Sequence, residues 1–193
     1  MHRNGWFLSL AGIGVVATAL CHENPSAKPL AQPKVEAETI RGQWRLPDDM
    51  LIRMVGKVAV VNARTLRFED GTMADLGGGI DTPELEQQGR IGGEMVPCGR
   101  EAVQFLEKLI DGRPVTCYLH PKMVEGRKYR SGSAFVGETN LQIEMVRNGW
   151  AIANHSQMAA WEAIARANRR GLWRGDFVLP EEWRKRKRLP GER

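Results

Sequence analysis

The sequence places short β-type stretches close together, and this order limits the folds that the chain can adopt. Residues 54–63, MVGKVAVVNA, are rich in β-branched side chains and alternate in part, which predicts a strand. The stretch TLRFEDGTMADL follows, with Asp70-Gly71 predicted as a tight turn between two short strands. Strands this close in sequence have no helices between them, so they favour a small meandering sheet over a regular β-α alternation.

Helical periodicity begins only after these strands. Residues 99–111 carry apolar side chains at three- and four-residue spacing, which predicts a helix ended by Gly112. RPVTCYL and GSAFVG predict two further strands. TNLQIEMVRNGWA predicts a second helix with Thr139 as its N-cap and Gly149 near its end, and residues 158–170 predict a third. This element order favours an α+β domain built on a small barrel.

The stretch GGGIDTPELEQ, residues 77–87, is the strongest candidate for a functional site. Asp81 and Glu84 flank a Thr-Pro pair, directly after a predicted strand. Two carboxylates held on a rigid turn can serve a metal ion and a water molecule. The same residue types are also common in ordinary solvated turns. From these residues alone, both interpretations stay open.

The element order, together with GIDTPE, CGREAVQFLEKLI, LQIEMVRNGWAIA and ARANRRGLW, resembles the staphylococcal nuclease (thermonuclease) family. The resemblance runs from about Met54 to Trp173. It implies a five-stranded OB-type β-barrel carrying three helices. It also implies hydrolysis of DNA or RNA phosphodiester bonds with the help of calcium.

The resemblance assigns a role to each residue of the acidic turn. Asp81 corresponds to a calcium-binding carboxylate, Thr82 to a ligand that binds through its backbone carbonyl, and Glu84 to the general base. Calcium neutralises a phosphate oxygen and helps to position water, while arginines stabilise the charge that builds on the phosphoryl group. Arg130 in KYRSGS is the predicted phosphate-binding arginine, with Arg127 as the alternative.

The sequence departs from the family pattern opposite this turn. NART stands where the family has D-G-D-T, so Arg64 takes the position of a calcium ligand. Asp75 or Leu76 replaces an arginine that the family places before the turn. We therefore predict an incomplete site with weak or lost calcium binding and cleavage, and Arg64 paired with Asp81 or Glu84. The alternative is a non-catalytic OB-fold module that binds nucleic acid or protein.

The flanking segments differ in composition from the predicted domain, residues 51–179. Residues 1–20 combine a basic start, an apolar run and an A-x-A pattern, which predicts a secretory signal. A lipoprotein signal ending at Cys21 and an uncleaved N-terminal anchor are the alternatives. Residues 21–50 predict a flexible linker, and residues 180–193 a basic C-terminal tail. The predicted location is extracytoplasmic, periplasmic or secreted, with no membrane span in the mature domain.

Charge and cysteine content suggest partners and a cross-link. The chain of 193 residues carries a formal net charge of +5, with much of the excess near its C-terminus, which is consistent with nucleic acid as a partner. No obligate protein partner is predicted. In an oxidising compartment, Cys98 and Cys117 are the predicted disulfide partners. Zinc held by these two thiols and His120 is the alternative, although no fourth ligand is evident.

Overall fold

The computed structural model describes residues 51–77, 79–122 and 128–192. The predicted signal (residues 1–20) and linker (residues 21–50) lie outside these ranges, as does Arg127. Within the described ranges, no helix combines the length and the apolar character that a membrane crossing requires.

Seven strands form the main sheet, in the order β1-β8-β9-β4-β3-β2, with β10 paired to β9. The neighbours pair antiparallel except β4 and β9, which run parallel. Their bounds are Ile52–Gly56 (β1), Val58–Asn62 (β2), Thr65–Phe68 (β3), Met73–Asp75 (β4), Val115–Leu119 (β8), Arg130–Val136 (β9) and Thr139–Asn140 (β10).

The stretch predicted as the first strand is divided in two at Lys57. Its first half, β1, pairs with β8, and its second half, β2, pairs with β3. The path of the sheet therefore begins and ends on strands that are consecutive in the chain. The α+β class is confirmed, and the predicted hairpin at Asp70-Gly71 is present, with Gly71 at φ 85°. A closed five-stranded barrel stays a prediction, because no ladder joins β1 to β2.

In its described part, the structure has two further small sheets besides the main sheet. The first pairs β5 with β11, and the second pairs β6 with both β7 and β12. Each strand has only two or three residues, and none was expected from the sequence. Their bounds are Ile80–Asp81 (β5), Gly89–Ile91 (β6), Glu94–Val96 (β7), Ile152–Ala153 (β11) and Asp176–Phe177 (β12).

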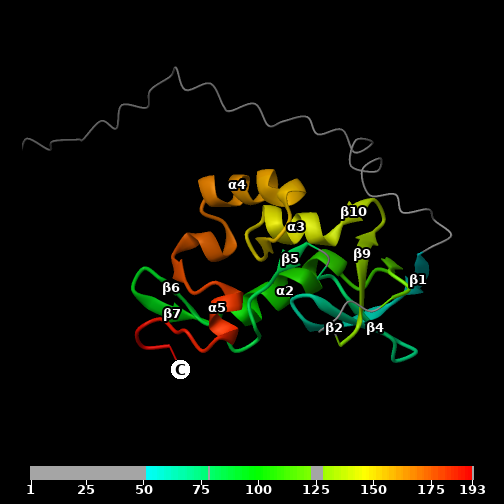
Figure 1. Ribbon diagram of the computed structural model, residues 1–193, viewed down its shortest axis with the longest axis horizontal. Coiled ribbons are helices and arrows are strands. Elements are labelled where there is room, and N and C mark those ends of the chain that lie inside the picture. Colours follow the sequence, from blue (N-terminus) through cyan, green and yellow to red (C-terminus); the bar gives the residue numbers. More distant parts are fainter. Residues whose placement is uncertain (1–50, 78, 123–127, 193) are drawn as a thin grey trace, which may run out of the picture. The chain divides into compact units, whose positions relative to one another are not determined.

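The described residues form four α-helices rather than the predicted three, together with two short 3-10 helices. Figure 1 shows α3 and α4 stacked together, and the C-terminal α5 beside β6 and β7. The additional helix, α5, lies in the segment that was predicted as a basic tail. The bounds are Cys98–Ile110 (α2), Leu141–Arg147 (α3), Ala159–Ala167 (α4), Pro180–Arg184 (α5), Ser156–Met158 (η2) and Gly171–Arg174 (η3).

The hydrophobic core lies between the main sheet and helices α2 and α3. One face of α2 buries Ala102, Leu106 and Ile110, in agreement with the apolar spacing in the sequence. α3 adds Leu141 and Met145, which are fully buried. A continuous core of this kind fixes the segments that carry the acidic turn.

The N-cap of α3 differs from the prediction. Asn140, not Thr139, caps the helix: its side-chain oxygen accepts a hydrogen bond from the backbone N–H of Ile143 at 3.0 Å. Thr139 is instead paired with Val136 in the β10–β9 ladder. Asn140 belongs to the same ladder but directly precedes Leu141, the first helical residue, and from this position its side chain reaches a free N–H group of the first turn.

The predicted disulfide is wrong for this structure, because Cys98 and Cys117 are both free and buried. Cys98 begins α2, and its Sγ donates to the carbonyl of Gln87 at 3.3 Å. Cys117 lies within β8, paired with Ala134, and belongs to the core. Burial raises the pKa of each thiol to about 12. In the described ranges, no three His, Cys, Asp or Glu side chains form a metal site.

Candidate active site

Strand β5 places Asp81 at the start of the acidic turn. Ile80 is fully buried and anchors the strand, while Asp81 pairs with Ile152 of β11. The next residue of β11, Ala153, donates its backbone N–H to the largely buried carboxylate of Glu162 on α4 at 2.6 Å. α4 thus stabilises β11, and β11 in turn fixes the backbone of Asp81.

The turn itself is held by hydrogen bonds between residues three positions apart and by the start of α2. Gln87 donates its backbone N–H to the carbonyl of Glu84 at 2.9 Å, and the Gln87 side chain accepts from the Glu84 N–H at 3.3 Å. Gly99 packs directly beneath, where an added Cβ would lie 1.9 Å from the Glu84 carbonyl oxygen. Only glycine permits this approach, so Gly99 allows the backbone of the turn to pack directly against the start of α2.

Asp81 is the buried member of the acidic pair, and Glu84 is the more accessible one. Asp81 is 5% exposed, and its Oδ1 accepts the backbone N–H of Thr82 at 3.0 Å. Thr82 is also buried, at 4% exposure. The Glu84 side chain is 36% exposed. A buried carboxylate needs a charged or hydrogen-bonding partner, and the partners of Asp81 are arginines.

Arg64 reaches the turn from the opposite edge, as predicted. Its Nη1 lies 3.6 Å from Oδ1 of Asp81, and its Nε lies 3.9 Å from Oδ1 of Asp75. Asp75 and Leu76, the two residues considered for the position before the turn, lie in different surroundings. Asp75 is the one that faces Arg64, whereas Leu76 is buried in the core. No ion pair joins Arg64 to Glu84 among the described residues.

Arg184 of α5 is the site residue that the sequence interpretation missed. Its Nη2 lies 2.7 Å from Oδ2 of Asp81, and its Nη1 lies 3.0 Å from Oδ1 of Asp81 and 3.0 Å from Oε1 of Glu84. This is a bidentate guanidinium–carboxylate pair with a third bond to the second acid. The hydrogen bond to Asp81 raises the pKa of Arg184 above its ordinary value, and Glu84 acts in the same direction.

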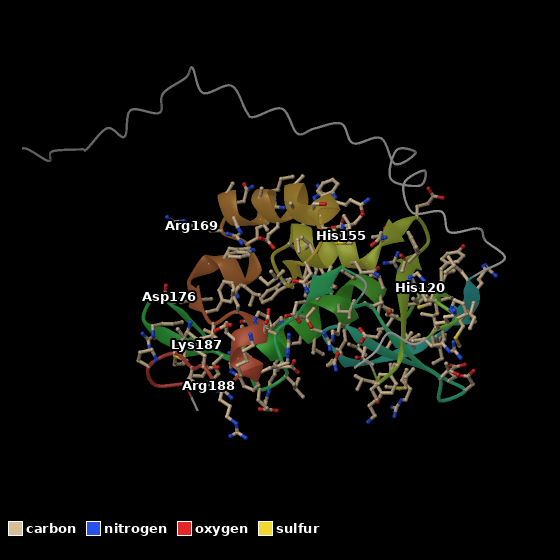
Figure 2. The ribbon with its side chains drawn as sticks, in the orientation of Figure 1. His120, His155, Arg169, Asp176, Lys187 and Arg188 are labelled. Carbon is tan, nitrogen blue, oxygen red and sulfur yellow. The ribbon has the colours of Figure 1, made fainter. Side chains whose placement is uncertain are left out.

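A local signal for this helix was present in the sequence. Leu179-Pro180-Glu181-Glu182 places a proline and two acids at a helix start, which is a common N-terminal pattern. That pattern predicts a short helix but not its contact with residues about 100 positions earlier in the chain. Figure 2 shows where the segment lies, with Lys187 and Arg188 labelled.

Arg130, the predicted phosphate-binding arginine, lies at the start of a strand of the main sheet. It begins β9, where it pairs with Ala74 of β4, and its side chain is partly buried. Within the described ranges it forms no ion pair with Asp81 or Glu84. The phosphate-binding role of Arg130 stays a prediction.

The residues present do not fit a calcium ion in this arrangement. Both carboxylate oxygens of Asp81 already accept hydrogen bonds from Arg184, and Arg64 adds a second positive charge 3.6 Å from Oδ1. Calcium takes six to eight oxygen ligands and is repelled by neighbouring guanidinium groups. The acidic turn is therefore neutralised by arginines from two directions.

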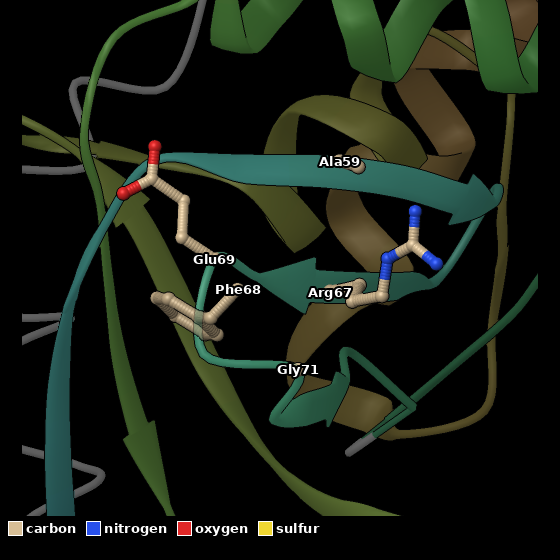
Figure 3. Close-up of a pocket in the computed structure, with 5 residues that line it drawn as sticks. All are labelled: Ala59, Arg67, Phe68, Glu69 and Gly71. Atoms are coloured by element: carbon tan, nitrogen blue, oxygen red, sulfur yellow. The ribbon is translucent and has the colours of Figure 1, made fainter.

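A shallow depression of about 400 Å³ lies elsewhere, over the β2–β3 ladder and the turn that follows it. Figure 3 shows its lining, in which exposed Arg67 and Glu69 flank Phe68. None of the residues that line it belongs to the acidic turn or to its arginine partners. It is a separate feature of the sheet surface.

Comparison with known proteins gives a family. The sequence model described as "Staphylococcal nuclease homologue" matches residues 77–175. Two proteins of Oryza sativa subsp. japonica, named probable staphylococcal-like nucleases CAN3 and CAN2, are each 34% identical over 116 residues, which is 57% of this chain and 28% of theirs. The staphylococcal-like nuclease CAN1 of Arabidopsis thaliana is 32% identical over 115 residues, 57% of this chain and 32% of its own.

The chain thus spans about a third or less of the length of these relatives. The family match covers just over half of the chain and includes Asp81, Thr82 and Glu84. Arg64 precedes the matched residues, and Arg184 follows them. The chain belongs to the staphylococcal nuclease homologue family and has an OB-like α+β fold.

Proposed function

We propose that this chain is a nuclease-like protein of the extracytoplasmic space whose calcium-dependent cleavage of nucleic acid is weak or lost. The single observation that carries the proposal is the occupation of Asp81 by Arg184. Both oxygens of the predicted calcium ligand are bonded to this guanidinium, at 2.7 and 3.0 Å. The predicted general base, Glu84, is bonded to the same group.

The physical consequence concerns both the metal and the water. A divalent ion that approached Asp81 would have to displace a bidentate, charge-assisted pair. Arg64 would remain 3.6 Å from the same oxygen and would still repel the ion. Without the ion, Glu84 has no positioned water to activate, and the charge on the phosphoryl group is not stabilised.

Calcium titration and digestion assays on the full chain test this proposal. Isothermal titration should give weak or undetectable calcium binding, and digestion of DNA and RNA in calcium should be slow or absent. An active staphylococcal-type nuclease serves as the positive control, and Glu84→Gln as the matched variant. Strong calcium-dependent cleavage by the wild type that disappears in Glu84→Gln would overturn the proposal.

A second candidate function is non-catalytic binding of nucleic acid. Its support is a set of arginines that stack on partly exposed tryptophans near α4. The Arg166 guanidinium lies 4.0 Å from the ring centroid of Trp173, and that of Arg174 lies 5.1 Å from the centroid of Trp150. Each guanidinium is also ion-paired with an acid, Arg166 with Glu162 and Arg174 with Glu101. The support is therefore the flat stacking surface of these pairs, on which unstacked bases can stack.

Fluorescence anisotropy with single- and double-stranded oligonucleotides distinguishes this candidate from a hydrolase. Binding without hydrolysis, weakening as salt rises and reduced in Arg174→Ala, would support the binding module. Binding that ignores salt, or none at all, would exclude it.

The location is tested separately, by the N-terminus of the protein recovered from the native cell. A mature N-terminus near Leu20 or Cys21 in an extracytoplasmic fraction is the expected result. An intact Met1 in the cytosol would contradict this part of the proposal.

A further inference from the structure

We propose that the acidic turn is the docking site of the chain's own C-terminal segment, and that this segment gates access to Asp81 and Glu84. Residues 179–192 are named the C-terminal strap. The strap would exclude divalent cations and phosphodiesters from the turn while it is docked, and would expose both carboxylates when it is released. The docking stands whether or not the domain cleaves nucleic acid, whereas the gate rests on the proposed loss of cation binding.

Arg184 is the strap residue that holds the turn. Three hydrogen bonds of 2.7 to 3.0 Å join its guanidinium to Asp81 and Glu84. Asp81 is almost completely buried, and the Arg184 side chain is 38% exposed. Bidentate pairs of arginine with a carboxylate are geometrically specific, which suits a docking contact.

The far end of the strap is held by Glu192. Its Oε1 accepts the backbone N–H of Gln88 at 3.0 Å and the indole N–H of Trp183 at 2.6 Å, while Oε2 accepts the Leu189 N–H at 2.9 Å. The strap is therefore folded back on itself and bonded to the residues that follow the turn. A second contact, between Arg90 and the Pro190 carbonyl, lies on the same side.

The residue just before the strap is bonded to the turn as well. Gln87 is fully buried, and its side-chain N–H donates to the carbonyl of Val178 at 2.6 Å. Because Gln87 also accepts the backbone N–H of Glu84, one side chain joins the turn to the start of the strap. The turn and the strap are thus connected at both ends and at Arg184.

Two of the four other cations of the strap are paired with acids inside it. Lys185 pairs with Glu181 at 2.7 Å, and Lys187 lies 3.8 Å from Glu182. The Arg188 guanidinium stacks on Trp183, 3.8 Å from the ring centroid. Among the described strap residues, Arg184 is the cation whose ion pairs reach outside the strap. The segment that composition predicts as a basic tail is therefore folded, and Arg184 supplies its ion pairs to the rest of the domain.

Occupation of the turn by Arg184 and by a cation are mutually exclusive. Both would use the same two oxygens of Asp81, and the first is already close to ideal geometry. A ligand can displace the strap only through its higher affinity for the open state. The equilibrium between docked and open strap therefore sets the apparent affinity of the turn for any cation.

Hydrogen exchange on the full chain tests the docking. Arg184→Ala should increase exchange of the strap amides by about tenfold or more, since it removes the charge-assisted pair with buried Asp81. Exchange in the main sheet should not change, which shows that the variant is folded. Arg186→Ala is the matched control, because Arg186 lies in the same strap and is exposed. Equal strap exchange in both variants would overturn the docking.

Calcium titration of the same variants tests the gate. Arg184→Ala should bind calcium at least tenfold more tightly than the wild type and Arg186→Ala, and Asp81→Asn added to Arg184→Ala should remove the gain. A released strap without that gain would overturn the gate and leave the docking in place. Strong cleavage by the wild type would overturn the proposed function and the gate, while protected strap amides would still support the docking.

Discussion

The residues that the family model matches and the residues that flank them contribute opposite charges to one site. The matched part supplies the acids of the turn, Asp81 and Glu84. The flanks supply the arginines that neutralise them, Arg64 before the match and Arg184 after it. A search confined to the matched part would describe a nuclease-type acidic turn. The whole chain describes an acidic turn that is already occupied.

This difference changes what the acidic residues can be taken to mean. A carboxylate that matches a family pattern has a role in folding as well as a role in chemistry, and the two can separate. Asp81 is buried and holds the C-terminal strap, which is a sufficient structural reason for an acid at that position. Glu84 is half-exposed and contributes one bond to the same contact.

The largest expected effect comes from adding a side chain at Gly99, where α2 packs against the turn. Gly99→Ala would place a methyl group 1.9 Å from the Glu84 carbonyl and 2.8 Å from that of Leu85. Because both neighbours are backbone, the turn or α2 must move, and we expect a loss of at least about 3 kcal/mol in the free energy of unfolding. Chemical denaturation measures it.

Gly56→Ala is the control for this change, because the added methyl would meet only the Phe68 ring, at 3.4 Å. A loss for Gly99→Ala no larger than that of Gly56→Ala would show that the turn is not seated on α2. The acidic turn would then not be held rigidly between the flanking arginines.

The next effect concerns the buried acid. Asp81→Asn would leave Arg184 and Arg64 facing an amide, and we expect a loss of about 2 kcal/mol, less than for a fully buried pair because Arg184 is partly solvated. Denaturation of Asp81→Asn, Arg184→Ala and the double variant forms a cycle. Additive losses would mean that the two side chains do not interact, against the structure.

Alkaline pH gives a smaller effect. The pKa of Cys98 is raised to about 12 by burial and then by Glu192 and Glu101, so its folded thiol stays protonated where the unfolded one ionises. The stabilisation is complete below pH 9 and declines as pH rises towards 12. Each thiol should lose up to about 1.4 kcal/mol between pH 9 and 10.

Cys98→Ala isolates the contribution of Cys98. Cys117, whose pKa is raised to the same value by burial alone, still contributes in both proteins. The variant should lose less stability than the wild type between pH 9 and 10, as measured by thermal or chemical denaturation at each pH. If the free energy of unfolding fell equally with pH in both proteins, Cys98 would not be a buried thiol in the wild type. A disulfide at Cys98 would give the same result.

Local sequence signals predicted much of the fold, and the errors have tertiary causes. Helix α2, the hairpin at Asp70-Gly71 and most strands of the main sheet follow from periodicity and turn residues. The division at Lys57 did not, because both halves have the same β pattern and only their partners differ. The β6–β7 hairpin was missed although Gly92-Gly93, both at positive φ, is a two-residue turn signal.

In the candidate site, too, local motifs were predicted from the sequence and a long-range contact was not. Asp81 and Glu84 were found from one short motif, and Arg64 from the departure of NART from the family pattern. Arg184 was missed because its contact spans about 100 residues and its basic neighbours resemble a solvated tail. Composition cannot show that Lys185 and Lys187 are already paired inside the segment.

The smallest expected effect separates the two acids of the turn. Glu84→Gln should lower the free energy of unfolding by about 0.5 kcal/mol or less, because the Glu84 and Arg184 side chains are both more than a third exposed and solvent screens their attraction. The glutamine carbonyl can still accept from Nη1 of Arg184, which preserves the geometry. Chemical denaturation of Glu84→Gln beside Asp81→Asn gives the comparison. Equal losses would show that strap docking depends on both acids, not chiefly on the buried one.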